Sequence, residues 1–267
     1  MLCKHFTLVL AAILTSRLAV ADAPAIAGIA YSADTGANLI DANTFVARKD
    51  FVLDALGAGR LRVQISGLPD GVILRDFHIE NDLHGDWLLT LDVGVTLSGI
   101  YFRPGDVIRF DGSSFTKEFD ATAAGVPPDV GCDGVARWGD TGKLLLSFDR
   151  TFVANGITIR PADVIVYSGG AFGKKVLDAH TLGLPANLNV DAVDTFRTKD
   201  YVLVSFDTGG EVGGIPFTSA DVMQLHLTSG VWTKRYAMLS FSNRWSYANL
   251  DGLLAINNDT IFQDDFE

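Results

Sequence analysis

The sequence contains little cysteine and few basic residues. Only two cysteines, Cys3 and Cys132, occur in 267 residues, and 21 lysines and arginines stand against 32 aspartates and glutamates. The formal charge at neutral pH is therefore −11. A surface of that sign repels a phosphate backbone, so the composition excludes nucleic acid as an expected partner.

The short motifs of several large enzyme classes are also missing. The sequence contains no Gly-x-Ser-x-Gly, no His-Glu-x-x-His and no phosphate-binding loop, and Gly57-Ala58-Gly59 lacks the third glycine of a dinucleotide site. These absences favour a non-enzymatic protein. With 48% hydrophobic and 20% charged residues, the chain is nevertheless able to bury a substantial core.

The one long apolar run lies at the amino terminus. Lys4 precedes the run at 6–14, and Ala19-Val20-Ala21 supplies the small residues that signal peptidase requires. Arg17 interrupts the run well short of the roughly 20 apolar residues that a membrane span needs. We therefore predict a signal peptide over residues 1–21 and a mature protein that is secreted, either extracellular or periplasmic.

Removal of this segment leaves 19 basic and 32 acidic residues, a formal charge of −13. That charge favours solubility and is compatible with binding of divalent cations. Cys132 is then the only cysteine, so no intrachain disulfide can form, and we expect it to be a buried small hydrophobic residue. No later segment is apolar enough to span a membrane.

The most informative signal is an internal repeat. Residues 88–92 recur at 145–149 and at 203–207, at intervals of 57 and 58 residues. Three further columns keep the same spacing: 104–107, 161–164 and 219–222; Leu68-Pro69, Val126-Pro127 and Leu184-Pro185; Phe115, Phe172 and Trp232. These columns define three repeats at about 68–125, 126–183 and 184–243.

Each repeat contains four short segments of strand composition, which is the content of one propeller blade. In the third repeat they are 190–196, 201–206, 222–227 and 231–238. The ends of the chain supply the strands of one more blade, with 249–254 as its first strand and 31–34, 50–54 and 60–65 as the others. We predict one domain over 25–259, a four-bladed β-propeller of about 58-residue blades closed by the N- and C-terminal strands, which removes two exposed sheet edges.

The repeats resemble those of bacterial secreted repeat proteins, mostly of unassigned activity, that read Leu-x-Ser-Phe-Asp, Gly-Leu-Pro and Val-Asp-Ala. The matching residues are 145–149, 203–207, 183–185 and 190–192. Residues 261–267 resemble the Ile-Phe-x-Asp-Gly-Phe-Glu tail of some exported proteobacterial proteins, with Asp265 where glycine is usual, so 260–267 is taken as a tail. The resemblance implies location and architecture and no catalytic residue.

Aspartates recur at three positions of the repeat. Two of the sets stand next to glycine and other loop residues, where a carboxylate caps a turn by accepting backbone N–H bonds. We expect this structural role for both sets: Asp34, Asp92, Asp149 and Asp207; Asp50, Asp106, Asp163 and Asp221.

The third set lies inside the apolar first strand of each blade, and we expect it to approach the propeller axis from four sides. Its members are Asp76, Asp133, Asp191 and Asp251. Such a ring repels itself unless it is neutralised, and hard oxygen ligands suit Ca²⁺ or Mg²⁺. The alternative is that each carboxylate accepts backbone N–H bonds from a neighbouring blade.

The blade at 68–125 departs from the others by carrying acidic and histidine side chains at every second position: His78, Glu80, Asp82, His84 and Asp86. A strand would place them on one face, as a transition-metal or acid–base site requires, but a turn at 83–86 would split the set into a solvated hairpin. Four further aromatic residues could bind carbohydrate if exposed, but we expect core positions for them: Trp87, Trp138, Trp245 and Tyr247.

Three functions remain open. The first is a secreted non-enzymatic binding or scaffold protein that recognises a protein or a glycan at the cell surface, with a structural Ca²⁺ in its channel. The second is a secreted hydrolase that uses the carboxylates and histidines of the blade at 68–125. The third is a purely structural envelope protein. A pocket containing Glu80 or His84 beside a perturbed carboxylate would favour the enzyme, and a flat aromatic face would favour binding.

Overall fold

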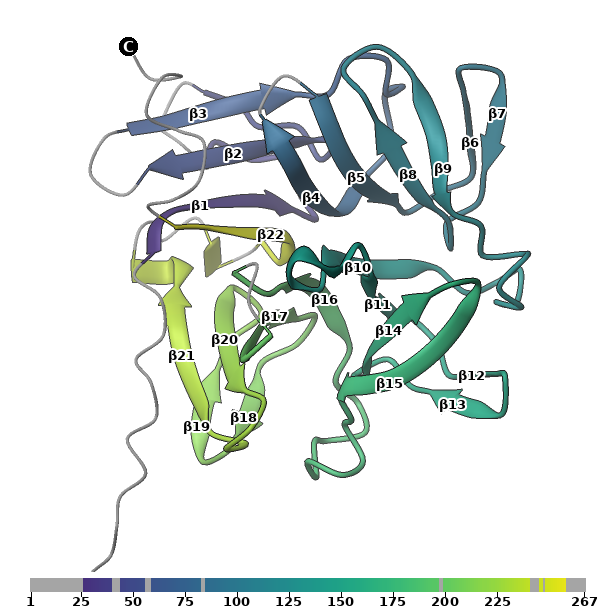
Figure 1. Ribbon diagram of the computed structural model, residues 1–267. Coiled ribbons are helices and arrows are strands. Elements are labelled where there is room, and N and C mark those ends of the chain that lie inside the picture. Colours follow the sequence, from purple (N-terminus) through teal and green to yellow (C-terminus); the bar gives the residue numbers. More distant parts are fainter. Residues whose placement is uncertain are drawn as a thin grey trace, which may run out of the picture.

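The computed structural model places four antiparallel sheets around a common axis and confirms the predicted four-bladed β-propeller (Figure 1). The structure describes residues 26–39, 44–55, 59–82, 85–196, 199–240, 245–246 and 248–257. The predicted signal peptide and the tail at 260–267 lie outside the described residues. Among the described residues, no helix combines the length and the hydropathy needed to cross a membrane.

The three repeats form three blades in the predicted strand order. The first repeat blade contains β4 (Leu74–Asp82), β5 (Gly85–Leu91), β8 (Val107–Phe110) and β9 (Phe115–Phe119). The second contains β10 (Cys132–Arg137), β11 (Leu144–Phe148), β14 (Val164–Ser168) and β15 (Ala171–Leu177). The third contains β16 (Val190–Asp194), β17 (Tyr201–Phe206), β20 (Asp221–His226) and β21 (Trp232–Ala237). Two 3₁₀ turns, η1 (Gly139–Thr141) and η2 (Met238–Ser240), lie between strands.

The fourth blade, the terminal blade, is assembled from both ends of the described chain. Its strands in spatial order are β22 (Leu250–Asn257), β1 (Ile26–Ala33), β2 (Asp50–Ala55) and β3 (Gly59–Gln64). β22 runs antiparallel to β1, with Ile26 opposite Asn257 and Ala33 opposite Leu250. The terminal strands thus pair with each other, as the closure of the ring requires.

Three small hairpins, one in each repeat blade, were not expected from the sequence. They are β6 (Val95–Leu97) with β7 (Ile100–Phe102), β12 (Phe152–Ala154) with β13 (Ile157–Ile159), and β18 (Gly210–Val212) with β19 (Ile215–Phe217). Both residues of each connecting turn have positive φ: Ser98-Gly99, Asn155-Gly156 and Gly213-Gly214. A two-residue turn of this conformation matches the twist of paired strands, so each hairpin has a local cause.

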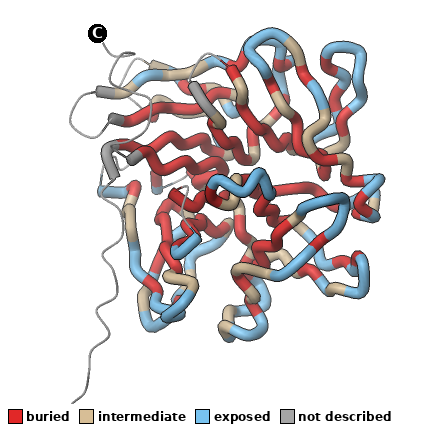
Figure 2. Tube along the Cα trace, viewed as in Figure 1, coloured by how far each residue is buried: buried red, intermediate tan, exposed pale blue. Residues whose placement is uncertain are grey.

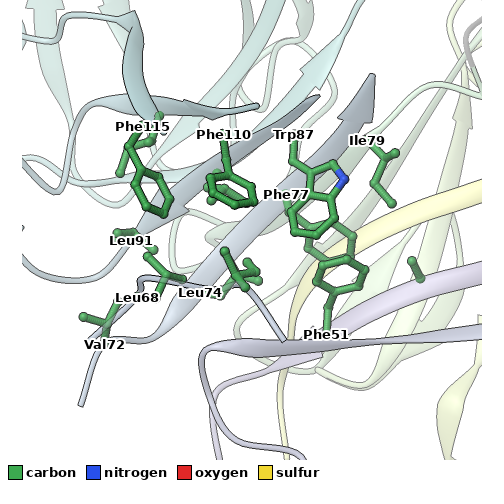
Figure 3. Packing of buried hydrophobic residues seen from close by; sticks show 14 of the residues in the cluster. Phe51, Leu68, Val72, Leu74, Phe77, Ile79, Trp87, Leu91, Phe110 and Phe115 are labelled. Atoms are coloured by element: carbon green, nitrogen blue, oxygen red, sulfur yellow. The ribbon is translucent and has the colours of Figure 1, made fainter. Parts of the chain in front are cut away.

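The hydrophobic core lies between the blades, and Figure 2 shows buried chain around the axis with exposed loops outside it. Four clusters of buried residues each join two neighbouring blades. In the cluster between the terminal and first repeat blades, Phe51 stacks on Phe77 with ring centroids 4.4 Å apart and meets the edge of Trp87 (Figure 3). Trp87 and Trp245 are buried, as expected, whereas Trp138 is half-buried and Tyr247 lies outside the described residues.

Buried hydroxyl groups also join each blade to the next. A serine or threonine near the end of the second strand donates to a carbonyl oxygen in the first strand of the following blade, at 2.8–3.3 Å. The pairs are Ser32 with Leu74, Thr90 with Asp133, Ser147 with Val190, and Ser205 with Leu250. The four bonds close a ring, which gives the repeated hydroxyl position a structural reason.

The two aspartate sets assigned to turns have that role. Asp34, Asp92, Asp149 and Asp207 each accept the backbone N–H of the residue just before an inner strand, at 2.7–3.2 Å. The other four each accept the N–H three residues earlier and pair with a basic side chain: Asp50 with Arg62, Asp106 with Lys117, Asp163 with Lys175, and Asp221 with Lys234. Cys132 is buried, as predicted.

Candidate functional site

Two cavities open at the two ends of the inner strands β4, β10, β16 and β22. The first, here called the acidic cup, has a volume of about 370 Å³. Six carboxylates line it: Asp92, Asp133, Asp149, Asp191, Asp207 and Asp251. Its wall also contains Arg75, Asn189, Asn249 and Ile73.

The second cavity, of about 350 Å³, contains His78, Glu80, Glu118 and Arg137 in its wall. Arg75 in the cup and Glu80 in the second cavity are five residues apart on β4, which corresponds to roughly 16 Å along an extended strand. The two cavities therefore belong to opposite faces of the propeller.

A single carboxylate separates them. Asp76 is fully buried on the axis and accepts four backbone N–H bonds, one from the inner strand of every blade. Oδ1 accepts from Phe77 at 2.9 Å and from Leu253 at 3.1 Å, while Oδ2 accepts from Val135 at 2.7 Å and from Val193 at 3.1 Å. Burial raises the pKa of the Asp76 carboxyl well above its usual value, against the opposing effect of the four N–H groups.

These four N–H bonds also establish which residues are equivalent between blades. Phe77, Val135, Val193 and Leu253 are each the fourth residue of an inner strand. Asp76 is the third residue of β4, where the other strands have Gly134, Ala192 and Gly252, which leave room on the axis for one long side chain.

The predicted ring of four aspartates is therefore divided in the structure. Asp133, Asp191 and Asp251 are the second residues of their strands, and the second residue of β4 is Arg75. The ring at the floor of the cup thus consists of one arginine and three aspartates, with Asp76 one residue deeper. Sequence reasoning placed Asp76 one position out of register and missed Arg75.

Hydrogen bonds connect most of this ring. The Arg75 guanidinium donates to Asp133 and, at 3.3 Å, to Asp149. Asn189 Nδ2 donates to Asp133 Oδ2 at 2.8 Å and to Asp191 Oδ1 at 3.0 Å. A further amide, Asn249 Nδ2, donates to Asp191 Oδ2. Asp133 and Asp191 thus have donors between them.

Asp251 differs from the other two acids. Its side chain is more than nine-tenths buried, yet it has no hydrogen-bond donor among the described residues. Burial raises its pKa to about 8, with a further contribution from Asp34 and opposition from Arg75. Burial also raises the pKa of Asp133 to about 6 and, together with the charges of Asp133 and Asp251, moves that of Asp191 well above its usual value. The cup consequently retains protons near neutral pH.

We expect the melting temperature to fall as the pH rises from about 4 to about 8. An unfolded aspartate titrates near 3.9, so over this range folded Asp251 holds a proton that the unfolded chain has lost. The stability linked to this proton is complete below pH 4 and is lost as the pH passes 8. Asp251→Asn should flatten the profile and raise the melting temperature at pH 9 by roughly 5 °C, about 2 kcal/mol.

Calorimetric melting of both proteins between pH 4 and 9 measures this effect. Asp140→Asn, an exposed aspartate at the second cavity, is the control and should keep the wild-type profile. Parallel profiles for the wild type and Asp251→Asn would contradict the prediction.

The five residues singled out in the first repeat blade do not form one cluster. His78 is buried, with Nδ1 3.9 Å from Asp194 Oδ1. Glu80 pairs with Arg137 at 2.5 Å, and Arg137 also pairs with Glu118. Three residues lie elsewhere: Asp82 ends β4, His84 is outside the described residues, and Asp86 in β5 pairs with Arg109 at 2.5 Å. The carboxyls with raised pKa line the acidic cup and not this cavity.

No group of three or more histidine, cysteine, aspartate or glutamate side chains within the described ranges has the arrangement of a metal site. In the cup, the amide nitrogen of Asn189 stands between Asp133 and Asp191 and bonds to both. A Ca²⁺ or Mg²⁺ ion shared by these two carboxylates would have to displace that amide. The expected channel cation remains a prediction.

Comparison with known proteins adds one distant likeness. The sequence matches no protein-family model and no curated protein sequence. Among solved structures it is similar to the extracellular domain of a proposed one-component system from B. thetaiotaomicron, at 13% identity and a TM-score of 0.34. The match covers 78% of this chain and 28% of the other, so the chain spans about a quarter of that structure's length.

Proposed function

We propose that this protein is an exported, non-enzymatic binding protein that recognises a protein partner through the face bearing the acidic cup. The observation that carries the proposal is the cup itself, an open cavity on the propeller axis with six carboxylates in its wall. Concentrated charge of one sign attracts a partner of the other sign and sets its orientation.

The rigidity of the cup supports a binding role. Its side chains stand at the start of inner strands that are fixed by the axial N–H bonds of Asp76 and by the hydroxyl ring between blades. Arg75, Asn189 and Asn249 are held by the acids they bond to. Binding to groups that are already ordered costs little conformational entropy.

The chemistry of the cup favours a basic protein over a glycan. Sugars are commonly bound against exposed aromatic rings, and none of the ten described residues in the wall is aromatic. The side chains of Trp87, Trp232 and Trp245 are buried in the core. A cationic surface, in contrast, would find acceptor oxygens of matching charge.

A carboxylate-dependent hydrolase is the second candidate. One observation favours it: Asp133 and Asp251 share a cavity but have pKa values of about 6 and about 8, a separation that acid–base catalysis can use. This version relocates the hydrolase expected from the sequence, because Glu80 is held by Arg137 on the opposite face.

Affinity capture with the immobilised mature protein tests the proposal. A cup variant, Asp191→Asn with Asp251→Asn, should lose the captured partner at least tenfold. A control of equal charge change outside the cup, Asp129→Asn with Asp140→Asn, should retain it, since both of these residues are exposed. Capture that survives the cup variant, binding to a glycan array instead, or hydrolysis of the captured molecule would contradict the proposal.

A further inference from the structure

The amides in the cup follow a rule set by the symmetry of the blades. Asn189 immediately precedes β16 and donates to Asp133, the acid of the preceding blade. Asn249 immediately precedes β22 and likewise donates to Asp191 of the preceding blade. Each amide therefore reaches back across one blade interface to the acid there.

At the interface between the second and first repeat blades the rule is replaced by a different contact. The residue before β10 is Gly131, and a Cβ there would lie 2.7 Å from the Arg75 guanidinium. Glycine thus makes room for Arg75, whose own charge supplies the donors to Asp133.

At the remaining interface nothing replaces the amide. The residue before β4 is Ile73, which lines the cup and has no side-chain donor. The acid that an asparagine at this position would reach is Asp251. This accounts for a carboxylate that is only 8% exposed and has no hydrogen-bond donor among the described residues. The ring has one open acceptor beside one aliphatic side chain.

We infer that the acidic cup binds an alkylammonium group, whose N–H groups donate to Asp251 and whose carbon stem packs on Ile73. The inference rests on the proposed function and names the group that the partner presents. An ammonium supplies three donors and a positive charge on a compact head, with an apolar stem behind it. It comes from a lysine side chain of the partner or from a small free amine.

Other ligand classes fit the same place less well. A metal ion needs several free oxygen ligands, but Arg75, Asn189 and Asn249 already bond to Asp133 and Asp191. An anion would be repelled by the six carboxylates. The volume of about 370 Å³ is at the small end for ligand sites and accommodates one side chain better than a large molecule.

Binding must be linked to proton release. The ammonium binds the ionised form of Asp251, whereas the free protein holds a proton there up to about pH 8. The charged groups that act on this carboxyl are Arg75, Arg48, Asp34, Asp133 and Asp191. The ammonium itself stays protonated throughout, so the affinity should rise up to tenfold per pH unit between about 6 and 8.

Isothermal titration calorimetry of the mature protein tests the inference with four probes: n-butylammonium, Nα-acetyl-lysine methylamide, tetramethylammonium and CaCl₂. We expect at least one primary ammonium probe to bind, with proton release at pH 7 measured in two buffers of different ionisation enthalpy. Tetramethylammonium has no N–H donor and should bind at least tenfold more weakly. Preference for the lysine derivative identifies a protein side chain as the source, and preference for butylammonium a free amine.

Two variants make the test specific. Asp251→Asn removes the acceptor and should weaken ammonium binding at least tenfold. Ile73→Asn supplies the amide that symmetry calls for at this interface, so it should raise the melting temperature and also weaken binding at least tenfold. Asp140→Asn in the second cavity is the control and should bind as the wild type does.

Three results would overturn the inference: no heat from either primary ammonium at pH 9, equal binding of tetramethylammonium, or unchanged binding by Ile73→Asn. Ca²⁺ binding that competes with the ammonium and is lost in Asp251→Asn would assign the cup to a metal and overturn it too. Partner capture that depends on the cup, without ammonium binding, would leave the proposed function standing. Ammonium binding without partner capture would remove that function and retain a small-amine site.

Discussion

Replacing Asp76 by alanine is expected to lower the free energy of unfolding by about 4 kcal/mol or more. The side chain is fully buried and accepts one N–H from each blade, so its removal leaves four donors facing one another on the axis. Each unsatisfied buried donor costs about 1–3 kcal/mol. Alanine itself fits, because Ala192 occupies the equivalent place in β16. For a chain of this size the loss corresponds to roughly 10 °C or more in melting temperature.

A small anion should restore this stability. The four N–H groups converge on the space that the carboxylate vacates, and formate has the same two oxygens. At 100 times its dissociation constant, formate would stabilise the variant by about 2.7 kcal/mol. Ser147→Ala, which removes a buried hydroxyl that donates to Val190, is the matched control and should gain no such stability from formate. Equal effects of formate on both variants would count against the axial role of Asp76.

Deleting residues 244–267 is expected to abolish cooperative unfolding. The deletion removes β22, which pairs with β1 along its length, carries the N–H of Leu253 that Asp76 accepts, and contributes the buried Leu250. The exposed edge of β1 would then favour aggregation. Removing 260–267 alone leaves β22 intact and should leave the melting temperature nearly unchanged. Thermal melting with light scattering measures both effects.

A peptide of residues 244–259 added to the truncated chain provides a stricter test. Because a missing strand can be supplied by addition to a sheet edge, the peptide should restore a cooperative transition. The same peptide with Leu253→Asp, which would place a charge at a buried position, should not. A truncated chain that melts like the full protein would show that ring closure does not contribute to stability.

The blade order and the ring closure could be predicted because repeats of 57 and 58 residues keep strand composition in register. The small hairpins were missed although their signal is local. Asn155-Gly156 and Gly213-Gly214 are typical of two-residue turns, and each is followed by an isoleucine that starts a strand. Each strand has only three residues, too few for a clear alternation.

The register of the cup could not be fixed by counting from one column. Counted back from Asp92, the acid that matches Asp133 is Asp76, because both lie 16 residues before the repeated aspartate. Counted forward from Pro69, the match is Arg75, six residues on, just as Asp133 is six residues after Pro127. The connection between β4 and β5 is one residue longer than that between β10 and β11, so only the forward count agrees with the structure. Contacts across blades, such as that of Asn189 with Asp133, have no trace in a single repeat.

The pairing of β22 with β1 also fixes where the protein would be held if it were attached to something. β22 starts at the acidic cup, next to Asn249, and its far end at Asn257 lies opposite Ile26, the start of β1 (Figure 1). Both ends of the described chain therefore leave the disc together, on the face away from the cup. A tether at either end would turn the cup outward, towards whatever approaches, and would leave its rim unobstructed.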